Sequence, residues 1–274
     1  MQTNAIQRQY DEVIAACYDR DPQAVIGHSL RRALDQLLRQ GLLADDDGPL
    51  HVLDLGMGTG RFLETLTRHA DRPVRPTGLD LSGKMIDVAR TRIPDLVAIV
   101  QDARHFDRHF ADESFDLIAT HFITGFVPLG VLAPMIWDKL AEGGYWTFVG
   151  GTKAGFPELQ RKASAAPMRW LCGGRAPAVD DLVCNPADQA EVMHTLEEHN
   201  FVVRECESFM PEVQFANLDD FLEFAYYGGW LTPFIEAMGL HQAGRFTRLA
   251  VNTFFFPVRD HHSVEIVLAQ KVDR

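Results

Sequence analysis

The stretch HVLDLGMGTGRF, residues 51–62, decides the fold of this chain. Its apolar first half predicts a buried strand, and the residues from Arg61 to His69 predict a helix with one apolar face. Between them, three glycines at alternate positions predict a tight turn: Gly56, Gly58 and Gly60. Because glycine has no Cβ, a strand, turn and helix of this kind bring backbone N–H groups close to a bound ligand.

The spacing of the glycines separates two kinds of cofactor site. The dinucleotide fingerprint is G-x-G-x-x-G or A, whose last small residue lets helix and strand pack together. Here the spacing is G-x-G-x-G, and Arg61 stands where that last small residue would fall. An acid, Asp54, also precedes the turn. The pattern D-x-G-x-G-x-G resembles motif I of class I S-adenosylmethionine (SAM)-dependent methyltransferases, which implies SAM as cofactor and S-adenosylhomocysteine as product.

A regular alternation of strands and helices follows the glycine turn. Apolar runs predict strands near 74–80, 96–100, 115–120 and 145–149, and helices are expected at 83–92 and 128–140. Such an alternation predicts a parallel sheet covered on both faces. A helix at 187–199 and strands at 201–209 and 263–270 resemble the end of the family's sheet. We therefore expect an α/β fold: a Rossmann-like class I methyltransferase sheet of seven strands, mostly parallel, with an antiparallel final strand and a helical cap.

Two segments outside this alternation are expected to form the cap. Residues 1–44, with helices predicted at 4–20 and 29–40, form an N-terminal helical cap segment in this interpretation. Residues 45–274 form the SAM-binding domain. It contains a helical, aromatic-rich insertion at about 211–258, where the family often places a lid over the methyl acceptor.

Acidic residues end or follow three of the predicted strands: Asp54, Asp80 and Asp102. In open α/β sheets the ligand lies beyond the carboxyl ends of the strands, so these acids are expected to face one crevice. The Asp80 carboxylate can accept hydrogen bonds from both ribose hydroxyls, which indicates an adenosine but does not distinguish SAM from NAD.

The resemblance also implies individual cofactor contacts. Asp54 would orient the turn and contact the methionine end of SAM. Asp102 would accept a hydrogen bond from the adenine amino group, and the Ala103 N–H would bind the ring. For Met85, core packing explains the residue as well as contact with adenine does. The full set of expected cofactor-binding residues is Asp54, Gly56, Met57, Gly58, Gly60, Asp80, Leu81, Met85, Asp102, Ala103 and Thr120.

Two residues are candidates for a catalytic role. SAM is an activated methyl donor, so the protein mainly supplies proximity and orientation, and a base is needed only if the acceptor must lose a proton. His121, after the fourth strand, is the candidate base, with positioning or simple packing as alternatives. Tyr18 lies in YDEVIAACYDRD, residues 10–21, which resembles the opening of the quinone- and biotin-pathway methyltransferase group. There an N-terminal helix closes over SAM and a tyrosine reaches the site. Other histidines are weaker candidates, and His261 and His262 predict a solvated loop.

Composition narrows the class of partner. The 274-residue chain carries a formal net charge of −12, which disfavours nucleic acid and anionic membranes as partners. Its four cysteines form no C-x-x-C pair and no zinc pattern, so reduced thiols in a cytoplasmic protein without a metal are expected. We find no secretory signal and no stretch of about 20 apolar residues. A small-molecule acceptor and a monomer or homodimer are expected.

These observations predict a SAM-dependent methyltransferase that modifies O, N or C of a small, partly apolar or aromatic metabolite, such as a biosynthetic intermediate. The sequence FDLIATHF, residues 115–122, stands where nucleobase and protein-glutamine methyltransferases carry N-P-P-Y or D-P-P-Y, which argues against those substrates. One alternative is a SAM-fold binding or regulatory subunit without turnover. A weaker alternative is an NAD(P)-dependent oxidoreductase, whose glycine fingerprint is broken here.

Overall fold

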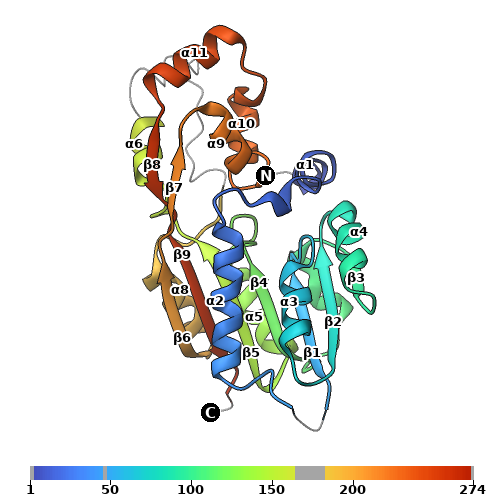
Figure 1. Cartoon of the computed structure of the whole chain (residues 1–274). Helices are drawn as coiled ribbons and strands as arrows, with labels where there is room; N and C mark the ends of the chain where they lie inside the picture. Colours follow the sequence, from blue (N-terminus) through green and yellow to red (C-terminus); the bar gives the residue numbers. More distant parts are fainter. Residues whose placement is uncertain (1–2, 46–47, 164–182, 273–274) are drawn as a thin grey trace.

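A seven-stranded sheet forms the centre of the molecule (Figure 1). The computed structural model describes residues 3–45, 48–163 and 183–272. The strand order is β3-β2-β1-β4-β5-β9-β6, and only β9 runs antiparallel to its neighbours. The expected Rossmann-like sheet with an antiparallel final strand is confirmed. The strands are β1 (Leu50–Leu55), β2 (Val74–Asp80), β3 (Val97–Val100), β4 (Phe115–His121), β5 (Leu140–Gly151), β6 (Val202–Phe209) and β9 (Val264–Gln270).

Helices cover both faces of the sheet, as parallel βαβ units require. Figure 1 shows α2 and α3 in front of the sheet and α5 and α8 behind it. Each face has its own apolar core, and the central strands contribute to both. The covering helices are α2 (Val25–Arg39), α3 (Arg61–His69) and α4 (Gly83–Arg92) on one face, and η3 (Ala103–His109), α5 (Leu129–Lys139) and α8 (Gln189–Glu198) on the other. No helix in the described ranges is long and apolar enough to cross a membrane.

The segment 1–44 does not act as a single cap. In α2, Ala33, Leu34 and Leu37 are fully buried in the front core. The Gln36 side chain donates to the carbonyl of Ile266 in β9 at 3.1 Å. The prediction of a cap over 1–44 is therefore wrong for α2, whose apolar stripe packs on the sheet.

The residues before α2 do not form one helix over 4–20, as their periodicity suggested. They form α1 (Thr3–Gln9), a π-helical turn η1 (Tyr10–Ile14) and a 3₁₀ turn η2 (Tyr18–Arg20). The irregular path follows from tertiary contacts, since Asp11 accepts hydrogen bonds from the Ser82 hydroxyl at 2.5 Å and the Lys84 N–H at 3.2 Å. These contacts hold the segment against the start of α4.

The region 211–258 contains helices, as expected, and two short strands that were not predicted. The Asn217 side chain caps its first helix, accepting from the N–H groups of Asp219 and Asp220 at 2.8 and 3.0 Å. The predicted helix over 217–240 is interrupted near Gly229, which has a φ of +81°. The elements are β7 (Glu212–Phe215), α9 (Leu218–Ala225), α10 (Thr232–Ala237), η5 (Leu240–Gln242), α11 (Arg245–Phe254) and β8 (Val258–His261), with α6 (Pro157–Ala163) against β8.

Two further details differ from expectation. Strand β5 begins at Leu140 instead of residue 145, because two glycines before residue 145 pair with the C-terminal segment. The Gly143 N–H donates to Lys271 O, and the Lys271 N–H donates to Gly144 O. Free thiols are described at Cys17, Cys184 and Cys206, while Cys172 lies outside the described residues.

Gly60 is the position of the turn at which a side chain is least tolerated. It has a φ of +78°, and a Cβ there would lie 3.0 Å from the Ala89 Cβ. Gly41 has a similar φ of +71° but nothing within 4 Å of a Cβ, so it isolates the backbone effect. We expect Gly60→Ala to lower the free energy of unfolding by about 3 kcal/mol and Gly41→Ala by only about 1 kcal/mol. Urea unfolding measures both, and equal losses would mean that α4 moves to accommodate the methyl group.

Candidate functional site

The glycine turn is fixed to the end of the neighbouring strand β2. The Gly56 N–H donates to the carbonyl of Leu79 at 2.7 Å, and the Gly58 N–H donates to Oδ2 of Asp80 at 2.9 Å. Gly56 and Gly58 have φ values of +72° and +55°, in the region that favours glycine. The turn thus presents its backbone at the carboxyl edge of the sheet, where ligands of this fold class bind.

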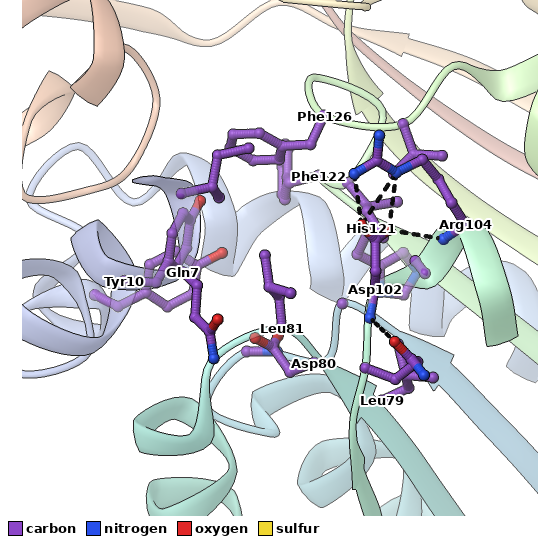
Figure 2. Close-up of a pocket in the computed structure, with 18 residues that line it drawn as sticks. Gln7, Tyr10, Leu79, Asp80, Leu81, Asp102, Arg104, His121, Phe122 and Phe126 are labelled. Carbon is purple, nitrogen blue, oxygen red and sulfur yellow. Dashed lines mark hydrogen bonds and ion pairs between the residues drawn. The ribbon is translucent and has the colours of Figure 1, made fainter. Parts of the chain in front are cut away.

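A pocket with about 760 Å³ of empty space, part of it open to solvent, lies over this edge. Figure 2 shows Gln7 and Tyr10 on one side of it, Asp102 and Arg104 on the other, and Asp80 and Leu81 between them. The complete lining is Ile6, Gln7, Tyr10, Tyr18, Gly56, Gly58, Leu79, Asp80, Leu81, Gln101, Asp102, Ala103, Arg104, His121, Phe122, Ile123, Phe126 and Val127.

Asp80 joins the turn to the pocket. Its Oδ2 accepts from Gly58 N–H, and its Oδ1 accepts from Ser82 N–H at 2.8 Å. Burial raises the pKa of Asp80 to about 6, so the side chain is mainly ionised at pH 7. A carboxylate has about four acceptor positions, so lone pairs remain for a ligand's hydroxyl groups.

Asp54 lies beneath the turn and does not line the pocket. It is only 2% exposed, and its Oδ1 has no hydrogen-bond partner among the described residues. Burial, together with the charge of Asp80, raises the pKa of Asp54 to about 8. A buried acid with an unpaired oxygen suits a cationic group close to the turn.

At the opposite end, Asp102 and Ala103 line the pocket. Asp102 is already paired, because the Arg104 Nε donates to Oδ1 at 3.0 Å and the Arg104 Nη2 donates to Oδ2 at 2.5 Å. This pairing lowers the pKa of the Asp102 carboxyl. Sequence reasoning missed Arg104, although its position two residues after Asp102 is a readable signal.

His121 lines the pocket, but its environment does not favour a general base. The residue is 8% exposed, and its ring packs edge-on against Phe62 with a centroid distance of 4.2 Å. Burial lowers the pKa of His121 to about 3. The imidazole is therefore neutral near pH 7 and too weakly basic for efficient proton removal.

Several predicted cofactor residues do not line the pocket. Thr120 is fully buried, and its hydroxyl accepts a hydrogen bond from the Trp146 indole at 2.8 Å, so the prediction of a cofactor contact is corrected. Met85 is fully buried in the domain core, which supports the packing alternative. The Met57 side chain fills the space over Gly78, where a Cβ would lie 1.9 Å from its sulfur, and Gly60 packs against α4.

The N-terminal segment closes one side of the pocket with two tyrosines. Tyr18 contacts the turn closely, since a Cβ on Gly58 would lie 3.5 Å from the Tyr18 ring. Tyr10 packs edge-on against Phe126 at 5.9 Å. Burial raises the pKa of both phenols, so both are protonated near neutral pH.

Asp19 holds this segment in place. It accepts a hydrogen bond from the Thr59 hydroxyl at 2.7 Å and pairs with Arg92 at the end of α4. We expect Asp19→Ala to weaken binding of S-adenosylhomocysteine roughly fivefold to tenfold and to expose residues 3–20 to limited proteolysis. Asp35→Ala, which removes an exposed ion pair with Arg31 on α2, is the matched control and should change neither result. Unchanged proteolysis of Asp19→Ala would show that other contacts hold the segment.

A match to a protein family shows which kind of domain contains this site. Residues 52–142, from β1 into β5, match the family model described as a methyltransferase domain. The chain contains a class I SAM-dependent methyltransferase domain. The matched region includes the glycine turn, Asp80, Asp102 and His121.

Curated relatives of the methyltransferase domain match over short segments. The chain is 43% identical over 74 residues to a demethylmenaquinone methyltransferase of Thermotoga maritima, a match that covers 27% of this chain and 31% of that protein. It is 33% identical over 105 residues to a trans-aconitate 2-methyltransferase of Escherichia coli, covering 34% and 41%. The matches therefore span about a third to two fifths of these relatives' own length.

Solved structures resemble this chain over most of its length. The YcgJ protein of Bacillus subtilis has a TM-score of 0.58 at 15% identity, covering 89% of this chain and 100% of that chain. A Haloferax volcanii complex of the Trm112 methyltransferase activator with a putative methyltransferase contains a chain with a TM-score of 0.56 at 16% identity, covering 96% and 99%. At 15% and 16% identity, these similarities show a shared fold and carry no information about the substrate.

The described residues are compatible with SAM and offer no metal site. The unpaired, buried oxygen of Asp54 and the side-chain-free backbone at Gly56 and Gly58 match a ligand with a cationic end that approaches the turn closely. Among the described residues, no group of three or more His, Cys, Asp or Glu side chains could hold a metal ion.

Proposed function

We propose that this protein transfers the methyl group of SAM to O, N or C of a small, flat and largely apolar or aromatic metabolite. The observation that carries this proposal is one pocket lined by the glycine turn, Asp80 and Asp102 together with an apolar wall. The apolar wall consists of Tyr10, Phe122, Ile123, Phe126 and Val127.

The cofactor end of the pocket supports specific roles for its residues. In this proposal the Asp80 carboxylate accepts hydrogen bonds from the ribose hydroxyls, and Asp102 with the Ala103 N–H binds the adenine. Asp54 lies beneath the part of the turn that would hold the methionine end. SAM, when bound, supplies an electrophilic methyl group, so the chain has to bind and orient two molecules and exclude water.

The acceptor end of the pocket supports an uncharged substrate. Aromatic and aliphatic side chains form the apolar wall, and the buried His121 is neutral. A carboxylate or phosphate acceptor would have to give up its water without a cation from the apolar wall or His121 to replace it. In this proposal, His121 and Tyr18 orient the acceptor, and neither removes a proton from it.

Release of S-adenosylhomocysteine tests this proposal. The purified protein is incubated with SAM and pools of small aromatic metabolites, with Asp80→Ala as the matched control. We expect release that depends on the pool and on Asp80. Binding of SAM without release from any pool would instead favour the binding or regulatory alternative.

A further inference from the structure

His262 is a buried residue at the junction between the region 211–258 and the central sheet. It lies between β8 and β9 and is only 3% exposed, so the expectation of a solvated loop is wrong for this residue. Its ring stacks on Phe156, with centroids 4.4 Å apart and planes 14° apart. Trp230 meets the same ring edge-on at 4.9 Å.

Two glycines make room for this imidazole. A Cβ on Gly151, the last residue of β5, would lie 2.8 Å from Cε1 of His262. A Cβ on Gly155 would lie 2.8 Å from Nδ1 of the same ring. The backbone therefore approaches the ring more closely than a residue with a side chain would allow.

Neither ring nitrogen of His262 has a hydrogen-bond partner among the described residues, and both are buried. A neutral imidazole has one donor and one acceptor, and leaving each unpaired in the interior costs about 1–3 kcal/mol. Burial lowers the pKa of His262 to about 3, so protonation does not relieve this cost near neutral pH. A phenylalanine would fill the same space without the cost, which points to a binding partner for the imidazole.

The His262 ring is close to the cofactor pocket. Phe122, in the apolar wall, packs edge-on against Trp230 at 4.9 Å, and Trp230 in turn contacts His262. A single indole therefore separates the imidazole from the pocket wall. Neither Trp230 nor His262 lines the pocket, so a ligand that packs against Phe122 reaches the imidazole only when the Trp230 indole moves aside.

A second polar side chain lies at the same place. The Cβ position of Gly151 is 3.1 Å from Nε2 of His262 and 3.6 Å from Nδ2 of Asn185. The carboxamide of Asn185 and the imidazole of His262 therefore lie next to the same point, the Cβ position of Gly151 at the end of β5. Both are uncharged, so they suit a hydroxyl or carbonyl group and not a carboxylate.

We propose that His262, together with Asn185, forms the polar end of the acceptor site and binds a hydroxyl or carbonyl group of a flat aromatic acceptor by a hydrogen bond. This proposal rests on the proposed function, since it names the part of that site that selects the acceptor. His262 is a specificity-determining residue in this account and takes no part in methyl transfer itself.

The test compares two probes that differ by one hydroxyl group, 1-naphthol and naphthalene, bound to the protein saturated with S-adenosylhomocysteine. Calorimetry should give at least tenfold tighter binding of 1-naphthol to the wild type. In His262→Phe the two probes should bind equally, while His262→Gln, which keeps a donor and an acceptor, should retain part of the preference. His261→Phe changes the exposed neighbouring histidine and is the matched control, in which the full preference should remain.

Two further measurements separate this proposal from a purely structural role and from the proposed function. His262→Phe should bind S-adenosylhomocysteine within twofold of the wild type and should unfold at a higher temperature, because two unpaired buried nitrogens are removed. Equal binding of both probes to the wild type, or an undiminished preference in His262→Phe, would overturn the role of His262. Failure of the wild type to bind S-adenosylhomocysteine would instead overturn the proposed function.

Discussion

Asp80→Ala is expected to weaken the binding of SAM and S-adenosylhomocysteine by roughly 100-fold or more, about 2.7 kcal/mol. The carboxylate accepts the N–H groups of Gly58 and Ser82, and in our proposal it also accepts the ribose hydroxyls. Its removal takes away the ligand contacts and leaves two backbone donors unpaired in a buried place. Calorimetric titration measures the loss directly.

Two variants keep this result interpretable. Asp80→Asn preserves the size of the side chain and one acceptor oxygen, so it should fall between the wild type and Asp80→Ala. Asp87→Ala removes an exposed acid from α4 that lies 3.9 Å from Lys84, and this variant should bind like the wild type. Wild-type affinity in a folded Asp80→Ala protein would contradict the assignment of the ribose site.

Binding of S-adenosylhomocysteine is expected to strengthen as the pH rises from 6.5 to 8, by up to roughly tenfold per unit. Burial raises the pKa of Asp54 to about 8 in the free protein, so the side chain is protonated through most of this range. A cationic amino group near Asp54 favours the ionised form, so binding releases a proton. Above pH 8 the affinity should level off.

Asp54→Asn is the matched control, because the amide has a similar shape and cannot ionise. This variant should lose the pH dependence over the same range. If binding releases about one proton, the heats of binding measured at pH 7 in phosphate and in Tris should differ for the wild type by about the difference between the ionisation enthalpies of the two buffers. For Asp54→Asn the two heats should agree. Equal heats in both buffers for the wild type would mean that Asp54 does not change its protonation on binding.

The pH dependence of the stability of the ligand-free protein independently checks the direction of the Asp54 pKa shift. The folded state raises the pKa of Asp54 from 3.8 to about 8, so it favours the protonated form. The stability contributed by this group is therefore complete below about pH 4 and is lost as the pH rises through 8. The melting temperature of the wild type should fall relative to that of Asp54→Asn as the pH rises from 5 to 8, and the difference should level off above pH 8.

Local sequence patterns were sufficient for the central sheet and for part of the site. The strand, glycine turn and helix around Gly58 follow from apolar periodicity and from the freedom of glycine, which act over a few residues. Asp80 and Asp102 could be placed at one edge because parallel strands end on the same side. The helix expected at 83–92 is α4, and the Ser82 hydroxyl caps it by accepting the Met85 N–H at 3.1 Å.

Contacts between residues far apart in sequence account for the places where the structure differs from the sequence-based predictions. The helix expected over 4–20 is broken by Asp11 and by Asp19, whose partners lie about 40 to 70 residues away in sequence. Thr120 was predicted to bind the cofactor, but it is fully buried and its hydroxyl accepts a hydrogen bond from Trp146 on β5. The burial of His262 depends on Phe156 and Trp230, which no local pattern connects to it.

The most direct test of the central claim is calorimetric titration of the wild-type protein with SAM, S-adenosylhomocysteine and NAD. We expect micromolar binding of SAM and S-adenosylhomocysteine and no heat from NAD, because Arg61 follows the glycine turn where a dinucleotide site needs a small residue. Binding of NAD in place of SAM, or no binding of SAM, would contradict the role assigned to the glycine turn and to Asp80.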